Sequence, residues 1–267
     1  MTSRTTSGYQ LPAAEGRAEY IRENFNAIAG TYDRFNDIIT FGMHRRWKRK
    51  AVALTGLPRY RYSRARETTA GDTPGPRVLD LCSGSGDLSV ALARYLGPHA
   101  LITAMDYSPG MLEVLRQRLA ASTESTAIVG KIEIVEGDAT DLSRFADASL
   151  DAITIGFGLR NVQNRAACLK ECYRVLKADK HLIILDVGKV QGRITTFFHN
   201  FYFERIVPLI GHFLQGKHTE MYEYLPASAR VYPGPAELSE ELLAAGFRKA
   251  PFFNVMMGAA VIHMAVK

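Results

Sequence analysis

Short apolar runs alternate with amphipathic helical patterns through the middle of the chain. Five runs have the length and composition of buried strands: 77–82, 101–106, 132–135, 150–155 and 181–187. The segments between them that repeat apolar residues at helical spacing are 87–96, 109–121 and 165–177. Strands that alternate with helices predict a parallel, doubly wound sheet with right-handed crossovers.

Amphipathic helical patterns lie on both sides of this alternation. Residues 18–54 predict helix, with interruptions near Gly30 and Gly42. Residues 194–214 predict an aromatic helix that Pro208 kinks. The chain ends with a predicted helix at 236–245 and two predicted strands at 252–256 and 259–266. The predicted fold class is α/β: a doubly wound, mostly parallel, seven-stranded sheet with N-terminal helices and a helical insertion before the last strands.

Positive charge is concentrated in one stretch of the chain. Residues 44–66 hold nine Lys and Arg residues and no acid, whereas the remainder has 24 basic and 27 acidic residues, a net charge of −3. This basic patch could meet nucleic acid, anionic lipid headgroups or only water. We expect three regions: an N-terminal helical cap at 1–54, a basic loop rich in Pro and Gly at 55–76, and the main domain at 77–267.

Composition excludes several classes of protein. The 267 residues are 47% apolar and 22% charged, which is typical of a folded domain and not of a disordered or collagen-like chain. Three cysteines are too few for a disulfide framework, so we expect a reducing, cytoplasmic compartment. No apolar run is long enough to span a membrane, and the first residues have no secretory signal; a frayed terminus is favoured over a transit peptide.

A strand, a small-residue turn and a helix start follow one another at 78–88, and they predict a nucleotide site. Asp80 lies in the strand, Ser85 lies in the turn, and Gly84 and Gly86 allow a ligand to approach the backbone. Asp106 ends the next strand, 20 residues after Gly86, where it can accept hydrogen bonds from ribose hydroxyls.

The same loop favours S-adenosylmethionine over a dinucleotide. The third glycine of the dinucleotide fingerprint is replaced by Ser89, and Asp87 places a carboxylate where a pyrophosphate would bind. A carboxylate repels that anion and attracts a sulfonium and an amino group. Asp138, after the third strand, could receive an adenine amino group. By itself it would more often cap a turn, but its register with the two earlier strand ends favours the adenine contact.

With these residues, the chain resembles a class I methyltransferase, and more narrowly the ubiquinone/menaquinone biosynthesis C-methyltransferase family. Three stretches carry the resemblance: YDRFNDIITFGMHRRW at 32–47, DLCSGSGD at 80–87 and DAITIGFGLRNV at 151–162. A fourth signature is altered: Ala178-Asp179-Lys180 replaces Pro-Gly-Gly, and Asp186-Val187-Gly188 replaces Glu-x-Ser. We interpret this difference as a change of turn geometry that leaves the chemistry intact.

The resemblance implies a Rossmann-like methyltransferase sheet that uses S-adenosylmethionine to methylate a ring carbon of a polyprenylated hydroquinone. The implied cofactor contacts are Ser85, Asp106, Asp138, Ala139 and Gly156, in addition to the loop residues Asp80, Gly84 and Gly86. It also implies that Arg160, Asn161 and Tyr32 face the substrate. We assign Arg160 to stabilising the phenolate, Asn161 to hydrogen-bonding the ring oxygen, and Tyr32 or a water to removing the proton.

Several alternatives remain open at this level. Arg160 could form a surface salt bridge instead of facing the substrate. His44 could be catalytic, or it could pack against a helix or cap one. Cys168 and Cys172, one helical turn apart, indicate core positions and no metal site. The acceptor could be a naphthoquinol, which the motifs favour, a benzoquinol or a demethylphylloquinol.

Other functions and partners also remain open. An RNA methyltransferase and a non-catalytic assembly protein are the competing functions. The aromatic stretch 197–214 could line a tail channel, rest on a membrane or pack over the sheet. The protein could also contact a membrane surface peripherally or form a homodimer. We expect no nucleic acid partner.

Overall fold

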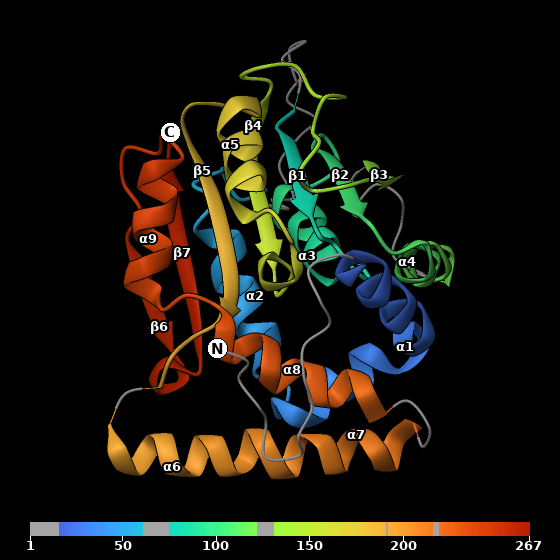
Figure 1. The fold of residues 1–267 in the computed structure, drawn as a ribbon. Helices are drawn as coiled ribbons and strands as arrows, with labels where there is room; N and C mark the ends of the chain where they lie inside the picture. Colours follow the sequence, from blue (N-terminus) through green and yellow to red (C-terminus); the bar gives the residue numbers. More distant parts are fainter. Residues whose placement is uncertain (1–15, 61–74, 122–130, 191, 216–218) are drawn as a thin grey trace.

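The computed structural model describes residues 16–60, 75–121, 131–190, 192–215 and 219–267. Its centre is a seven-stranded sheet with the strand order β3-β2-β1-β4-β5-β7-β6 (Figure 1). The strands are β1 Arg77–Leu81, β2 Leu101–Asp106, β3 Lys131–Glu136, β4 Leu150–Gly156, β5 Leu176–Val187, β6 Phe252–Val255 and β7 Ala260–Val266. The first five pair in parallel, while β7 is antiparallel to both β5 and β6. The predicted fold class is confirmed.

Helices cover both faces of this sheet. They are α3 Asp87–Leu96, α4 Pro109–Ala121, α5 Arg165–Val175 and α9 Pro235–Ala244. Successive residues of β1 point to opposite faces: Val78 packs with α3, whereas Leu79 packs with α5 and α9. Because both faces of the central strands are covered, these strands read as continuous apolar runs in the sequence.

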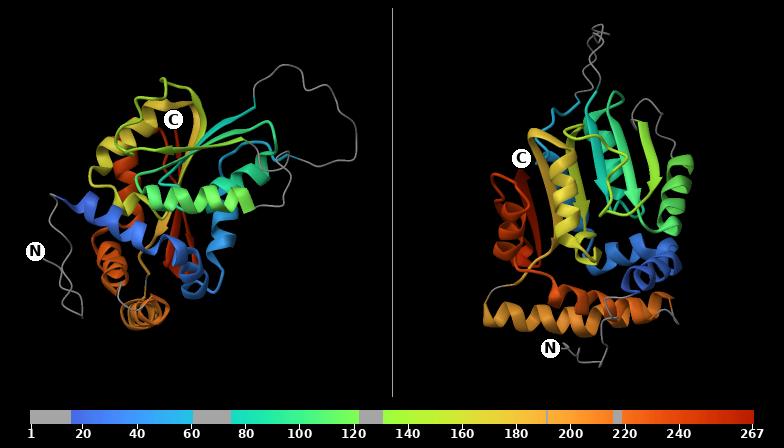
Figure 2. Two further views of the ribbon diagram at one scale, coloured as in Figure 1. Left: turned by 90° about the vertical axis from the view of Figure 1, so that its right-hand side faces the viewer. Right: turned by 45° about the horizontal axis from the view of Figure 1, so that its top comes forward.

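A further helical layer lies at the carboxyl ends of the parallel strands (Figures 1 and 2). It comprises α1 Arg17–Ile39, α6 Arg193–Phe201, a π-helical segment Tyr202–Ile206, α7 Val207–Gln215 and α8 Thr219–Val231. α2 His44–Ala53 begins at this layer and packs with α3 over one face of the sheet. α1 packs on α4 and α7. This layer closes over the edge of the sheet where ligands of α/β folds bind.

The sequence prediction of these helices was wrong in three details. Gly30 does not interrupt α1; the chain turns at residues 40–43, where Gly42 has a φ of 68°. The kink predicted at Pro208 is not seen: the aromatic helix runs straight through this residue after a π-helical stretch (Figure 1). The wider π turns accommodate a residue that lacks a backbone N–H. α8 was not predicted, because Pro226 lies inside it.

The strand after α5 is longer than predicted. The apolar pattern indicated 181–187, but β5 begins at Leu176, directly after the helix. Asp179, in the altered signature, has a φ of 58°. This left-handed conformation costs glycine little, which is consistent with the glycine that the family has in this turn. The predicted loop at 55–76 lies mostly outside the described residues, and the division into three regions stays a prediction.

Candidate active site

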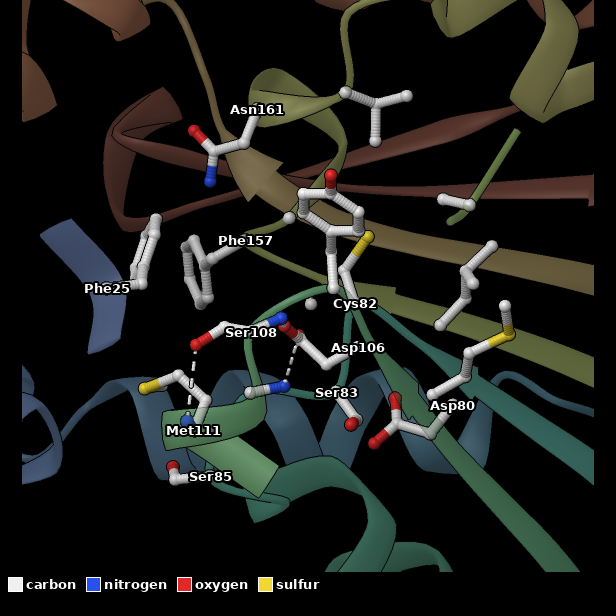
Figure 3. A pocket seen from close by; sticks show the side chains of 18 of the residues that line it. Phe25, Asp80, Cys82, Ser83, Ser85, Asp106, Ser108, Met111, Phe157 and Asn161 are labelled. Carbon is white, nitrogen blue, oxygen red and sulfur yellow. Dashed lines mark hydrogen bonds between the residues drawn. The ribbon is translucent and has the colours of Figure 1, made fainter. Parts of the chain in front are cut away.

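A cavity of about 240 Å³ lies at the carboxyl edge of the sheet, between the glycine loop, α1 and α4. Nine of the predicted site residues line it: Tyr32, Asp80, Gly84, Ser85, Asp106, Asp138, Ala139, Gly156 and Asn161. Figure 3 shows several of these side chains, with Phe25 and Phe157 beside one another and Asn161 pointing toward them. Two predicted residues, Gly86 and Arg160, do not line this cavity.

The two loop glycines have different reasons to be glycine. Gly84 lines the cavity with a φ of 55°. Gly86 has a φ of 80° and precedes α3, and a Cβ there would lie 2.2 Å from the Leu115 side chain of α4. Glycine at position 86 therefore allows α4 to pack closely against the loop, while its predicted contact with the cofactor stays a prediction.

Asp106 is fixed at the end of β2 by two backbone donors. Its Oδ2 accepts from the Gly84 N–H and its Oδ1 from the Ser108 N–H, both at 2.8 Å. Burial raises the pKa of this carboxyl, and the backbone hydrogen bonds partly offset that effect. An acceptor oxygen held rigidly next to the glycine loop fits the ribose contact predicted for it.

Asp80 lies deeper, below the loop. Its two carboxylate oxygens accept hydrogen bonds from Ser89 at 2.5 Å and from Thr154 at 2.8 Å. Complete burial raises the pKa of Asp80 to about 6, although both hydroxyl groups and Lys48 lower it. Asp80 therefore links β1, α3 and β4 under the cavity floor, a structural role that the sequence did not indicate.

Two residues of α1 contact the glycine loop and the start of α4, and the sequence assigned neither a role. Asp33 accepts a hydrogen bond of 2.5 Å from the Ser85 hydroxyl. Asn26 accepts from the Ser108 hydroxyl at 2.7 Å and from the Gly110 N–H at 2.8 Å. Asp33 follows Tyr32 in the N-terminal signature, which was the only sequence signal for it.

Asp138 makes the local contact considered as its alternative role. Its Oδ1 accepts from the Thr140 backbone N–H at 2.8 Å and from the Thr140 hydroxyl at 2.9 Å. It also lines the cavity together with Ala139. The same carboxylate can therefore cap its turn and still present an oxygen to the cavity.

Asp87 does not act as an isolated carboxylate. Lys48 lies 2.6 Å from it and Arg118 2.5 Å, with His44 at 3.7 Å. Burial alone would raise the pKa of Asp87, but these neighbours hold it well below its ordinary value. Its charge is therefore balanced by protein cations, and the argument that Asp87 itself attracts a sulfonium is wrong as stated. This pairing, together with that of Arg45 with Asp37, accounts for part of the basic patch.

Arg160 lies at a second, more apolar cavity of about 120 Å³ and forms a buried ion pair. Its Nη1 is 2.5 Å from the Oδ1 of Asp186, and the two side chains are 4% and 0% exposed. Burial alone would lower the pKa of Arg160, but the charge of Asp186 raises it, so the guanidinium stays charged. The surface salt bridge weighed for Arg160 is instead a buried one. Asp186 belongs to the altered signature and had no predicted role; this contact shows that it holds Arg160 in place.

Asn161 is held by a residue that the sequence missed. The Tyr224 hydroxyl donates to the Asn161 Oδ1 at 2.9 Å. Tyr224 is buried on α8, the helix that was not predicted. Because the carbonyl oxygen of Asn161 accepts this bond, its amide N–H₂ is directed elsewhere and can donate.

Four residues line both cavities: Tyr32, Asn36, Lys48 and Phe157. Phe157 has a φ of 58°, a strained conformation for an aromatic residue. It follows β4 directly, and the Arg160 guanidinium lies 5.8 Å from the centre of its ring. A group bound in the first cavity and a group bound in the second would meet at these residues.

The three cysteines lie in two kinds of surroundings. Cys168 and Cys172 are fully buried in the core, as predicted. Cys82 lines the first cavity, and burial raises the pKa of its thiol well above the ordinary value. A raised pKa disfavours the thiolate, which is the nucleophilic form of cysteine. In the described part of the chain, no cluster of His, Cys, Asp or Glu has metal-site geometry.

Comparison with known proteins also indicates a methyltransferase. The model of the ubiE/COQ5 methyltransferase family matches residues 13–267. The chain is 38% identical over 262 residues to demethylmenaquinone methyltransferase of Leptospira interrogans, with 98% of each chain covered. It is 34% identical to the ubiquinone/menaquinone biosynthesis C-methyltransferase UbiE of Shewanella pealeana, over 98% of this chain and 96% of that protein.

Solved structures support the fold. An S-adenosylmethionine-dependent methyltransferase of Thermotoga maritima superposes with a TM-score of 0.58 at 17% identity, over 92% of this chain and 99% of that chain. A methyltransferase of Methanococcus maripaludis superposes with a TM-score of 0.55, also at 17% identity. At this level of identity the likeness concerns the arrangement of helices and strands alone.

Proposed function

The chain belongs to the ubiE/COQ5 methyltransferase family, and from this premise we propose that it converts demethylmenaquinol to menaquinol. It is a methyltransferase with S-adenosylmethionine as its methyl donor. The acceptor we propose is a ring carbon of a polyprenylated demethylnaphthoquinol. The relative with 38% identity is named for that substrate, whereas the relative with 34% identity is named for both ubiquinone and menaquinone.

The first cavity fits the donor. Asp106 offers a half-buried carboxylate beside the glycine loop, and Asp138 and Ala139 follow the third strand. Gly84 has no side chain that would keep a ligand away from its backbone. We propose that these residues, with Ser85 and Gly156, hold S-adenosylmethionine. When bound, the donor supplies a methyl group on a positively charged sulfur.

The second cavity fits the acceptor, and the buried ion pair at its wall carries this assignment. Arg160 lines this apolar cavity, and Asp186 keeps its guanidinium fixed and charged. A buried charge in apolar surroundings interacts strongly with an opposite charge that forms beside it. The negative oxygen of an ionised hydroquinone bound in this cavity would meet that positive charge.

The residues at the junction then have distinct roles in the proposed reaction. A phenol ionises with a pKa of about 10, and its ortho carbon becomes nucleophilic only as the phenolate forms. Arg160 and the amide of Asn161 stabilise the negative oxygen, and Tyr32, or a water bound to it, receives the proton. The new carbon–carbon bond forms as the sulfur–methyl bond breaks, with its electron pair left on sulfur. The ring carbon then gives its own proton to a water molecule, and the ring regains its aromaticity.

The place of action follows from the acceptor. A polyprenylated hydroquinone resides in the bilayer, so we propose a cytoplasmic enzyme with peripheral membrane contact; a homodimer is compatible with this proposal. None of the helices in the described part of the chain combines the length and apolarity needed to span a bilayer.

A panel of acceptors tests the proposal. Purified protein with S-adenosylmethionine is offered demethylnaphthoquinol, the corresponding benzoquinol and demethylphylloquinol, and separately unmodified tRNA. We expect the highest kcat/KM with demethylnaphthoquinol and no methylation of tRNA. Preference for the benzoquinol would reassign the head group. Methylation of tRNA, or no turnover with any quinol, would contradict the proposal.

A further inference from the structure

The long helix formed by α6, the π-helical segment and α7 exposes a continuous set of large apolar side chains. We call this set, together with Phe41 in the turn between α1 and α2, the phenylalanine face. Its members and their exposed fractions are Phe41 76%, Phe197 67%, Phe198 64%, Phe201 55%, Leu209 66% and Phe213 90%. Contiguous exposed aromatic surface of this kind is uncommon on monomeric soluble proteins and marks an interaction site.

The helix is docked on the protein by its opposite side, so the exposure does not come from a detached segment. Val207 is fully buried against Phe35 and Leu225. The Tyr202 hydroxyl donates to the Ile39 carbonyl at 2.9 Å. The ring of Phe41 stacks on that of Tyr202 at 6.5 Å, which joins Phe41 to the helix. Figures 1 and 2 show this helix as the outermost layer beyond the carboxyl ends of the strands.

The second cavity lies immediately behind this face. Its lining includes Thr40, Tyr202 and Met256. Each of these has an exposed apolar neighbour in the chain: Phe41, Phe201 and Met257 are 76%, 55% and 76% exposed. Met256 itself lines the cavity and is 45% exposed. Exposed apolar side chains therefore stand next in the chain to residues from three separate segments of the cavity lining.

The charges around the phenylalanine face are positive. Between residues 188 and 215 the sequence has a single acid, Glu204, which pairs with Arg230. Arg193 and Arg205 of the same helix are exposed, and Arg46 is exposed beside the turn that carries Phe41. Aromatic side chains flanked by arginines match an anionic bilayer surface, where rings enter the acyl boundary and cations meet the headgroups.

We propose that the phenylalanine face inserts into the surface of an anionic lipid bilayer and presents the rim of the second cavity to the acyl chains. Resting on the proposed function, this arrangement lets a prenylated hydroquinone pass from the membrane into the cavity without crossing water. A second copy of the chain on the same face would cover that rim, so we favour the lipid surface over a dimer interface.

Vesicle binding tests the proposal with matched variants. The test variant is Phe201→Ser/Phe213→Ser. The control is Leu243→Ser/Phe252→Ser, on α9 and β6, whose replaced side chains are 49% and 38% exposed. Surface replacements of this kind change stability little. Vesicles of phosphatidylcholine with phosphatidylglycerol are sedimented with each protein, alongside vesicles of phosphatidylcholine alone.

We expect wild type and control to bind the anionic vesicles equally, and the test variant to bind at least roughly 30-fold more weakly, given the area lost with two phenylalanines. Salt should weaken the binding of the wild type. Unchanged binding of the test variant, or no binding by the wild type, would overturn the proposal. A wild-type dimer in light scattering that the test variant abolishes would assign the face to a second copy instead.

Turnover separates this proposal from the proposed function. A naphthoquinol with a single short isoprenoid tail, dissolved without vesicles, should be methylated equally by all three proteins. The test variant should lose turnover only on a long-tailed acceptor embedded in vesicles. If no protein methylates either acceptor, the proposed function fails, while the sedimentation result still decides whether the face binds lipid.

Discussion

Replacing Arg160 by methionine removes the cation of a fully buried ion pair. The Asp186 carboxylate, with no exposed side-chain area and a partner at 2.5 Å, would remain in the interior without that cation. Breaking such a pair from one side costs about 3–5 kcal/mol, because water cannot replace the lost partner. For a chain of this size we therefore expect the Arg160→Met variant to melt roughly 6–20 °C below the wild type.

The double variant Arg160→Met/Asp186→Leu separates the structural role of this pair from its chemical role. Removing both charges leaves no unpaired ion, so most of the lost stability should return. Turnover should not return, because no group then stabilises the ionised ring oxygen. The dissociation constant for S-adenosylmethionine, measured by calorimetry, should stay near that of the wild type in both variants, since Arg160 does not line the first cavity.

A half-exposed ion pair provides the matched control for stability. Arg165 and Glu241 also lie 2.5 Å apart, but their side chains are 27% and 35% exposed. The Arg165→Met variant should lose only about 0–1 kcal/mol. The reasoning is refuted if Arg160→Met melts no lower than this control, or if the double variant turns over at the wild-type rate.

Three further substitutions test separate parts of the site. Burial raises the pKa of Asp80 to about 6, so its stabilising contribution is present in acid and lost as pH rises through that value. Between pH 4 and pH 8, the unfolding free energy of the wild type should fall by about 2.4 kcal/mol relative to that of Asp80→Asn in urea titrations; a constant difference would contradict this. Asp106→Asn turns an amide N–H₂ toward the Gly84 or Ser108 N–H and should weaken calorimetric binding of S-adenosylmethionine about 10–100-fold. Tyr224→Phe releases Asn161 and should lower kcat about tenfold with no change in donor affinity; an unchanged kcat would place Asn161 outside the reaction.

The elements of the sheet could be predicted from the sequence because their patterns are local. β2, α3 and α4 begin and end where the apolar periodicity indicated, since each is bounded by turn residues or a helix start. The helical insertion was harder to predict. Its prolines are accommodated by a π-helical stretch and by packing against α1, which no local pattern reports.

In the candidate site, too, local patterns could be predicted from the sequence and contacts between distant segments could not. Side chains at the ends of successive strands, such as Asp106 and Asp138, were correctly expected to share one cavity, because parallel strands end at one edge. Contacts between distant segments were not predictable: Asp33 meets Ser85 and Asp186 meets Arg160 only through the tertiary fold. The sequence therefore indicated which residues gather at the site but not which charges neutralise one another there.

Transfer of a carbon-13 methyl group tests the central claim most directly. Purified protein is incubated with S-adenosylmethionine labelled at its methyl carbon and with demethylmenaquinol, and the extracted quinone is examined by NMR. The account predicts one labelled methyl bonded to a ring carbon of the naphthoquinone. Label on a ring oxygen, or none in the quinone while the donor is bound, would contradict it.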